Sequence, residues 1–117
     1  MEEKNYDSAI AAYNKAIELE PSNFMAYNDR GLNYIHKCKY EEAMRDIERA
    51  ITMAPDNQYR SSAMNNRAVI LFKLGRYKDA IKDLDIAIKL NGDNYLAYGN
   101  RSLINKNLVT FKSWGKG

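Results

Sequence analysis

The stretch AYNDRGLNYI at residues 26–35, in which small and aromatic residues surround an arginine, decides the fold of this chain. The pattern returns as AMNNRAVILF at 63–72 and as AYGNRSLINK at 97–106, so its arginines stand 37 and 34 residues apart. Three other sets of residues keep the same steps: Tyr6, Tyr40 and Tyr77; Ala9, Ala43 and Ala80; and Ala16, Ala50 and Ala87. A fixed period of this length is typical of a repeat protein. The unit is 34 residues long, with three extra residues between Ala50 and Arg67.

Each unit has the pattern of two amphipathic helices, because its apolar residues recur three and four positions apart. Gly75 falls between the two helices of one unit, Pro21 and Pro55 follow second helices, and Asn23 and Asn94 stand where helices need N-caps. We expect helices at 3–19, 23–37, 40–53, 57–74, 77–90 and 94–108. We assign the extra residues to QYR at 58–60, which would start the fourth helix a turn early and leave Tyr59 and Arg60 beyond the edge of the stack. A longer loop between repeats is the alternative.

The most complete copy carries an ordered set of landmarks: Tyr27, Arg30, Gly31, Tyr34, Tyr40, Ala43, Ile47, Ala50 and Pro55. This set resembles the tetratricopeptide repeat, and the resemblance covers residues 5 to about 108. It implies an all-α, right-handed solenoid of antiparallel helical hairpins, stabilised by the stacking of each hairpin on its neighbours. We expect a half repeat at 1–22, repeats at 23–57 and 58–94, a terminal helix at 94–108 and a tail at 109–117.

The composition is that of one ordinary globular domain, with 117 residues, 45% hydrophobic and 28% charged. The net charge of +3 comes from interspersed residues, so nucleic acid is not an expected partner. No apolar run approaches the roughly 18 residues of a membrane span, and the start lacks the features of a secretory signal, so we expect no membrane partner and a cytoplasmic location.

Catalytic and cofactor sites are not indicated either. Cys38 is the single cysteine and His36 the single histidine, which excludes an intrachain disulfide and any Cys/His spacing for zinc. His36 has no nucleophile or acid near it in sequence that would form a catalytic group. We therefore expect no catalytic residues, no metal and no cofactor.

The repeated arginine has a structural interpretation. Asp46 and Asp83 follow Arg30 and Arg67 by sixteen residues, on the second helix of the same repeat. An antiparallel hairpin would bring each pair together, with the aliphatic stem of the arginine packed in the repeat and its guanidinium on the carboxylate. We predict two ion pairs that belong to the frame.

The best-defined ligand site of the resembled family is a carboxylate clamp for the C-terminal peptides of heat-shock chaperones, built from Lys, Asn and Arg on successive first helices. Asn66 and Asn100 match the asparagine position of this clamp. Asp29 stands at that position one repeat earlier, and the basic positions one repeat later hold Leu96 and Asn100. The pattern therefore disfavours a working clamp.

The resemblance also implies a concave groove lined by the first helix of each repeat. We expect an apolar strip flanked by amides and bases, which marks a surface for a peptide or helix of a partner protein. The candidate groove residues are Asn28, Leu32, Ile35, His36, Asn65, Asn66, Val69, Phe72, Lys73 and Leu103, and the wider surface adds Met25, Ser62, Leu96 and Lys106. No acid occurs in this set, so a neutral or acidic ligand with apolar anchors is expected. The alternative is that these residues pack on another part of a longer or swapped chain.

Two other functions compete with this non-catalytic scaffold or adaptor role. The end helices lack hairpin partners, so they could drive homo-oligomerisation or join further repeats. The other competing function is RNA binding in a helical-repeat groove, which the scattered charge disfavours. For the tail, with Val109, Phe111 and Trp114, the possibilities in order of preference are disorder, docking on the last helix, and insertion into a groove.

Overall fold

The computed structural model describes the backbone of residues 2–116 and the side chains of residues 5–106. Within that part the chain forms six helices: α1 (Glu2–Leu19), α2 (Phe24–His36), α3 (Tyr40–Met53), α4 (Asn57–Lys73), α5 (Tyr77–Leu90) and α6 (Tyr95–Lys116). The predicted boundaries are confirmed to within one residue, except that α6 continues past residue 108. The disorder that was the preferred outcome for the tail does not agree with a backbone that is helical to Lys116. The other two outcomes depend on the side chains of Val109, Phe111 and Trp114, which lie outside the described residues.

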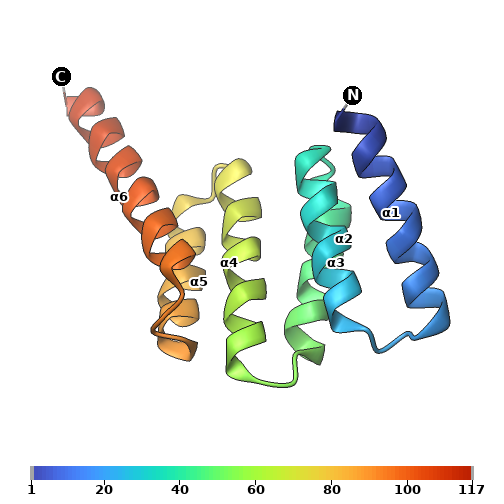
Figure 1. The fold of residues 1–117 in the computed structure, drawn as a ribbon. Coiled ribbons are helices and arrows are strands. Elements are labelled where there is room, and N and C mark those ends of the chain that lie inside the picture. Colours follow the sequence, from blue (N-terminus) through green and yellow to red (C-terminus); the bar gives the residue numbers. More distant parts are fainter. Residues whose placement is uncertain (1, 117) are drawn as a thin grey trace.

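The helices stand side by side in an elongated stack that measures 54 × 34 × 19 Å (Figure 1). Helices α2 and α3 form one hairpin, α4 and α5 form the next, and α1 and α6 flank them. Helix α4 also contacts both α2 and α6, so the first helices of successive repeats are neighbours. This is the predicted helical solenoid, and its first helices form one continuous surface.

The small residues of the repeat permit close contact between helices. Five alanines at repeat positions are at most 1% exposed: Ala43, Ala50, Ala68, Ala80 and Ala87. At Gly31 an added Cβ would lie 2.7 Å from Cδ1 of Ile47, which is itself fully buried. Because interiors are packed as densely as organic crystals, the hairpin of α2 and α3 has no room for a larger residue at this position.

Local signals in the sequence explain where the helices begin and turn. Asn23 and Asn94 accept hydrogen bonds at 3.1 Å from backbone N–H groups three residues later, which confirms both predicted N-caps. Gly75 turns the α4–α5 hairpin with a φ of 81°. Cys38 takes the same place in the α2–α3 hairpin with a φ of 62°, a conformation that is costly for a residue with a Cβ.

The three inserted residues lengthen α4 at its start. Helix α4 has 17 residues, whereas α2 has 13, so the early start is confirmed. The inserted side chains do not stand clear of the stack as expected. Arg60 donates to the carbonyl oxygens of Ala54 at 2.8 Å and Ile51 at 3.4 Å, at the end of α3. Tyr59 meets Phe24 of α2 edge to face, at 4.9 Å between ring centroids.

The predicted ion pairs are confirmed. Arg30 donates from Nε and Nη2 to the carboxylate of Asp46 at 2.7 and 2.8 Å, and Arg67 does the same to Asp83 at 2.8 and 3.1 Å. The hydrogen bonds to each aspartate raise the pKa of its arginine. The guanidinium groups thus bind buried carboxylates of the frame.

Each arginine also contacts the helix that precedes it in the stack. Nη1 of Arg30 lies 2.7 Å from Oδ1 of Asn14, and Nη1 of Arg101 lies 2.8 Å from Oδ1 of Asp85. Nη1 of Arg67 lies 3.6 Å from Oε2 of Glu48. Asn14, Glu48 and Asp85 occupy one repeat position, and Arg30 and Arg67 therefore join three helices across two layers. The spacing that predicted the aspartate partners did not indicate this second set.

Candidate functional site

Four of the predicted groove residues lie around one pocket between α4 and α6. Val69, Phe72 and Lys73 come from α4, and Leu103 comes from α6 together with two residues that were not predicted, Asn100 and Ile104. The cavity, which we name the α4–α6 pocket, has a volume of about 250 Å³. Leu103 is 61% exposed at its rim, and Ile104 is buried behind it. The lining is mostly apolar, with an ammonium and an amide at its edge.

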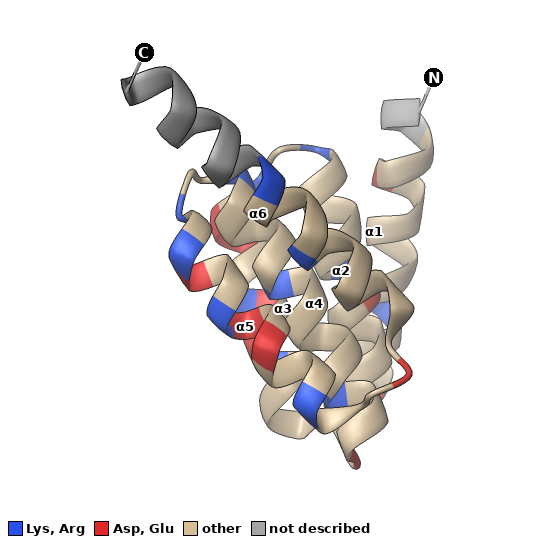
Figure 2. Cartoon of the chain, turned by 90° about the vertical axis from the view of Figure 1, so that its left-hand side faces the viewer, with Lys and Arg blue, Asp and Glu red and all other residues tan. Residues whose placement is uncertain are grey.

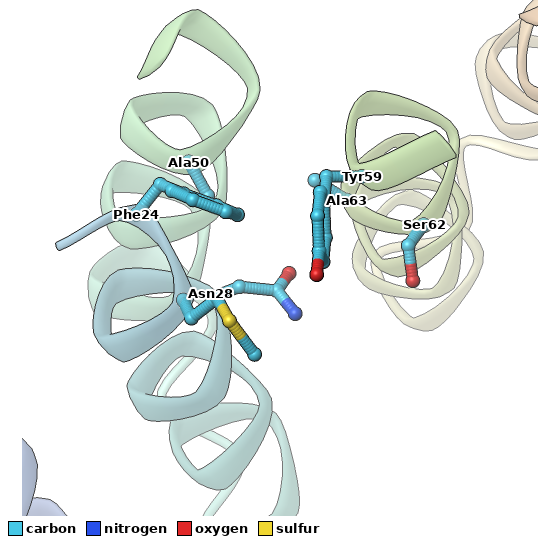
Figure 3. Close-up of a pocket in the computed structure, with 7 residues that line it drawn as sticks. Phe24, Asn28, Ala50, Tyr59, Ser62 and Ala63 are labelled. Atoms are coloured by element: carbon cyan, nitrogen blue, oxygen red, sulfur yellow. The ribbon is translucent and has the colours of Figure 1, made fainter. Parts of the chain in front are cut away.

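A second pocket lies between α2 and α4, near the starts of both helices. We name it the α2–α4 pocket; its volume is about 140 Å³, and it is lined by Phe24, Met25, Asn28, Ala50, Tyr59, Ser62 and Ala63. Figure 3 shows Phe24 and Asn28 extending from α2 toward Tyr59 on α4. Of the ten candidate groove residues only Asn28 belongs to it, and Met25 and Ser62 come from the wider predicted surface.

Amide side chains bridge the first helices between and beside these pockets. Asn66 of α4 donates from Nδ2 to Oδ1 of Asn28 at 3.0 Å, and Asn100 of α6 donates from Nδ2 to Oδ1 of Asn65 at 2.9 Å. Asn65 is only 6% exposed, so its role is to hold α6 against α4. The predicted amides of the groove therefore serve partly as links between repeats.

Besides Asn65 and Asn66, three of the predicted residues line neither pocket. Ile35 is 6% exposed and belongs to the core with Ala43 and Ile47, so it does not face an open strip; the periodicity did not separate the groove edge of α2 from its buried face. The ring of His36 stacks on Tyr6 of α1 at 5.1 Å between centroids. Leu32 is 36% exposed on α2.

The positions of the carboxylate clamp are not occupied by converging cations. Leu96 is 55% exposed on α6, and Asn66 and Asn100 already donate to other asparagines. Burial raises the pKa of the Asp29 carboxyl, which stands where the other repeats have asparagine. An arriving carboxylate would meet apolar and amide groups at these positions.

The charges are distributed unevenly between the two sets of helices. Figure 2 shows basic and acidic bands alternating along α5, whereas the described part of α6 shows basic bands alone. Within residues 57–73 of α4 and 95–106 of α6 the sequence contains no acidic residue. The surface that holds the α4–α6 pocket is therefore free of acids on both of its helices.

The sequence placed Met25, Asn28 and Ser62 on the concave surface, but it did not predict the other four residues that line the α2–α4 pocket. Its walls include Tyr59, which belongs to the inserted turn, and Phe24, which follows the N-cap of α2. The three-residue insertion was the available signal, because an added turn must place new side chains beside the preceding repeat. In the described part of the chain no helix is long and apolar enough to cross a membrane, and no cluster of three or more His, Cys, Asp or Glu side chains could hold a metal ion.

Comparisons with known proteins agree with the repeat. A TPR repeat model matches residues 1–37, and two tetratricopeptide repeat models match residues 24–57 and 61–94. The STIP1 homolog of Dictyostelium discoideum is 37% identical over 73 residues, which are 62% of this chain and 12% of that protein. The chain thus spans about an eighth of the length of this curated relative.

Two solved structures have the same fold. The first TPR of Spaghetti (RPAP3), bound to the HSP90 peptide SRMEEVD, superposes with a TM-score of 0.79 at 25% identity, covering 92% of this chain and 83% of that one. The second TPR domain of human RPAP3, in complex with the HSP70 peptide SGPTIEEVD, gives 0.76 at 30% identity, covering 89% and 84%. With its three matched repeat models, its landmark residues and this shared fold, the chain belongs to the tetratricopeptide repeat family.

Proposed function

We propose that this chain is a non-catalytic protein interaction module, a scaffold or adaptor that binds a peptide or helix of a partner on the surface of α2, α4 and α6. The observation that carries this proposal is the α4–α6 pocket, where Val69, Phe72 and Leu103 surround a cavity beside Lys73. Apolar anchors of a ligand would enter this cavity, and amides such as Asn28 and Asn66 would hold its register. We place this role in the cytoplasm.

The ligand is expected to be neutral or acidic. Helix α4 and the described part of α6 contain no acidic residue, so a negative ligand meets no repulsion from them. The two solved relatives bind peptides that end in EEVD, which makes a short peptide the first class of ligand to consider here. Leu96 and Asn100 replace the basic clamp positions, and we therefore propose recognition through apolar anchors, without dependence on a terminal carboxylate.

The test is a selection of peptides from a random display library on the wild-type chain, followed by affinity measurements on two variants. Leu103→Asp places a charge at the rim of the α4–α6 pocket from a 61% exposed position, so the fold should tolerate it. Ile86→Asp is the matched control, because Ile86 is 45% exposed on α5. We expect Leu103→Asp to weaken the selected peptides at least tenfold and Ile86→Asp to leave them unchanged. Equal binding by wild type and Leu103→Asp would refute the groove assignment.

A second experiment tests whether peptide binding depends on a free terminal carboxylate. The peptide SRMEEVD is titrated with a free and with an amidated C-terminus, alongside the selected peptides in both forms. Binding by anchors alone predicts that amidation changes each affinity by less than about threefold. A loss of about tenfold or more would be the sign of charge-assisted clamp contacts, each of which is worth about 1.5–3 kcal/mol.

Self-association is the second candidate function, and the surface of α6 favours it. Four large side chains in the first nine residues of this helix are exposed: Tyr95 at 78%, Leu96 at 55%, Tyr98 at 44% and Leu103 at 61%. Light scattering over a hundredfold range of concentration separates the two. A mass that stays monomeric at every concentration supports the peptide-binding module. A dimer that dissociates in the Leu96→Asp variant supports self-association.

A further inference from the structure

We propose that the α2–α4 pocket is a specificity pocket for one uncharged aliphatic side chain of the bound peptide, and that the inserted turn of α4 creates it. This inference rests on the proposed function, since it names a second anchor point for the same ligand. It adds a site at the opposite end of α4 from Val69 and Phe72.

The walls of the pocket are set by contacts within the chain. At one side the rings of Phe24 and Tyr59 meet at 4.9 Å with an interplanar angle of 68°. The Asn66–Asn28 hydrogen bond of 3.0 Å links the same two helices through a lining residue. Ala50 and Ala63 are 1% and 2% exposed and form the floor. The opening lies between two helices that are held at a fixed separation.

The size and charge of the pocket select its occupant. A cavity of about 140 Å³ is close to the ~150 Å³ that holds a benzene ring in an engineered protein core, so a side chain of four to six carbon atoms fits. None of its seven lining residues is charged, and a buried carboxylate or ammonium would lose its hydration without a partner. Leucine, isoleucine and methionine are the expected anchors.

One polar group at the pocket is available to the main chain of the ligand. The side chain of Asn28 is engaged at both ends, because its Oδ1 accepts from Asn66 and its amide hydrogen-bonds the Asp29 carboxylate. Among the described residues the hydroxyl of Ser62 makes no hydrogen bond, and it is exposed. This hydroxyl can donate to a backbone carbonyl next to an inserted side chain, which would fix the direction of the peptide.

The inserted turn supplies the wall that makes this pocket specific. Tyr59 is the middle residue of QYR at 58–60, and its backbone N–H donates to Oδ1 of Asp56, the N-cap of α4, at 3.0 Å. Arg60 fastens the same turn to the end of α3 through the carbonyl of Ala54 at 2.8 Å. The ring of Tyr59 is thus positioned before any ligand arrives, which lowers the entropy cost of binding.

The probe for this pocket is N-acetyl-leucine methylamide, followed in ¹H–¹⁵N spectra of the full chain, with N-acetyl-aspartate methylamide as the charged control. We expect the leucine probe to shift the amides of Asn28, Ser62 and Ala63 with a millimolar Kd, and the aspartate probe to shift none of them. Tyr59→Ala should weaken the leucine probe at least threefold. Tyr95→Ala, a change at another exposed tyrosine, should not. Ser62→Leu, which fills the pocket from an exposed position, should abolish the shifts.

Shifts confined to Val69 and Leu103, an absence of shifts, or equal affinity in wild type and Tyr59→Ala would each overturn this inference. These results are independent of the peptide-binding proposal. Leu103→Asp, which tests that proposal, should leave probe binding at the α2–α4 pocket unchanged. Conversely, loss of the leucine probe with selected peptides still bound would reject the specificity pocket alone.

Discussion

Replacing Arg30 by methionine should destabilise the stack more than any change to its partner. The guanidinium of Arg30 makes two hydrogen bonds of 2.7 and 2.8 Å to Asp46, and a third of 2.7 Å to Asn14. In the Arg30→Met variant the carboxylate of Asp46, whose side chain is 7% exposed, stays buried without its cation. The methionine stem keeps part of the packing against the neighbouring tyrosine rings, so the lost charge dominates the effect.

The magnitude follows from the unequal burial of the two partners. Breaking a buried pair by removing one member costs about 3 kcal/mol or more, and we expect this for Arg30→Met. Asp46→Leu should cost about 1–2 kcal/mol, because the arginine side chain is 20% exposed and can turn toward water. The double variant should be no less stable than Asp46→Leu, since no buried charge is left unpaired. The coupling energy is then about 3 kcal/mol or more, which is at least the loss expected for Arg30→Met alone.

The assay is urea unfolding followed by helical circular dichroism, with equal m-values as the check that the cooperativity of the stack is unchanged. Arg101→Met is the control, because the Arg101–Asp85 pair is a single exposed contact whose loss should cost less than about 1 kcal/mol. A loss below about 0.5 kcal/mol in Arg30→Met, or a double variant whose loss equals the sum of the two singles, would refute this account of the arginine.

Three further changes test the packing, the turn and the electrostatics. Gly31→Ala should lower the melting temperature although alanine is the better helix former by about 1 kcal/mol, because the new methyl group meets the buried Ile47 at 2.7 Å. Cys38→Gly should raise the free energy of unfolding in urea by about 1 kcal/mol, since glycine adopts the observed φ of 62° without strain, as Gly75 does in the next hairpin. Asp29→Asn should raise the melting temperature at pH 7 and leave it unchanged near pH 3. Burial raises the pKa of this carboxyl in the folded chain, so the unfolded chain loses its proton first and stability falls as pH rises through that range.

The repeat could be predicted in detail because its signals are local or strictly periodic. Gly75, Asn23 and Asn94 act within a few residues of their own positions, and the structure uses each of them as a turn or a cap. The Arg–Asp pairs were predictable for a similar reason. Once the two helices of a hairpin are known to be antiparallel, residues sixteen positions apart on them are expected to face each other.

The candidate site was less predictable, because a helical position borders more than one neighbour. Ile35 and Val69 follow the same apolar period, yet Ile35 is buried in the core and Val69 lines a pocket. Asn65 and Asn66 stand side by side in the sequence and bind different helices, α6 and α2. Which face of a helix stays open depends on the angle at which the next hairpin packs, and periodicity does not report that angle.

The sequence by itself determined the class of fold, the number and bounds of the helices up to the last one, and the partners of two arginines, because each follows from a period or a short-range signal. The tertiary structure alone decided where the surface is hollowed. Phe24 and Tyr59 lie 35 residues apart and form one wall because an inserted turn of α4 reaches back to α2. A pocket is a property of two packed elements, and neither element carries it alone.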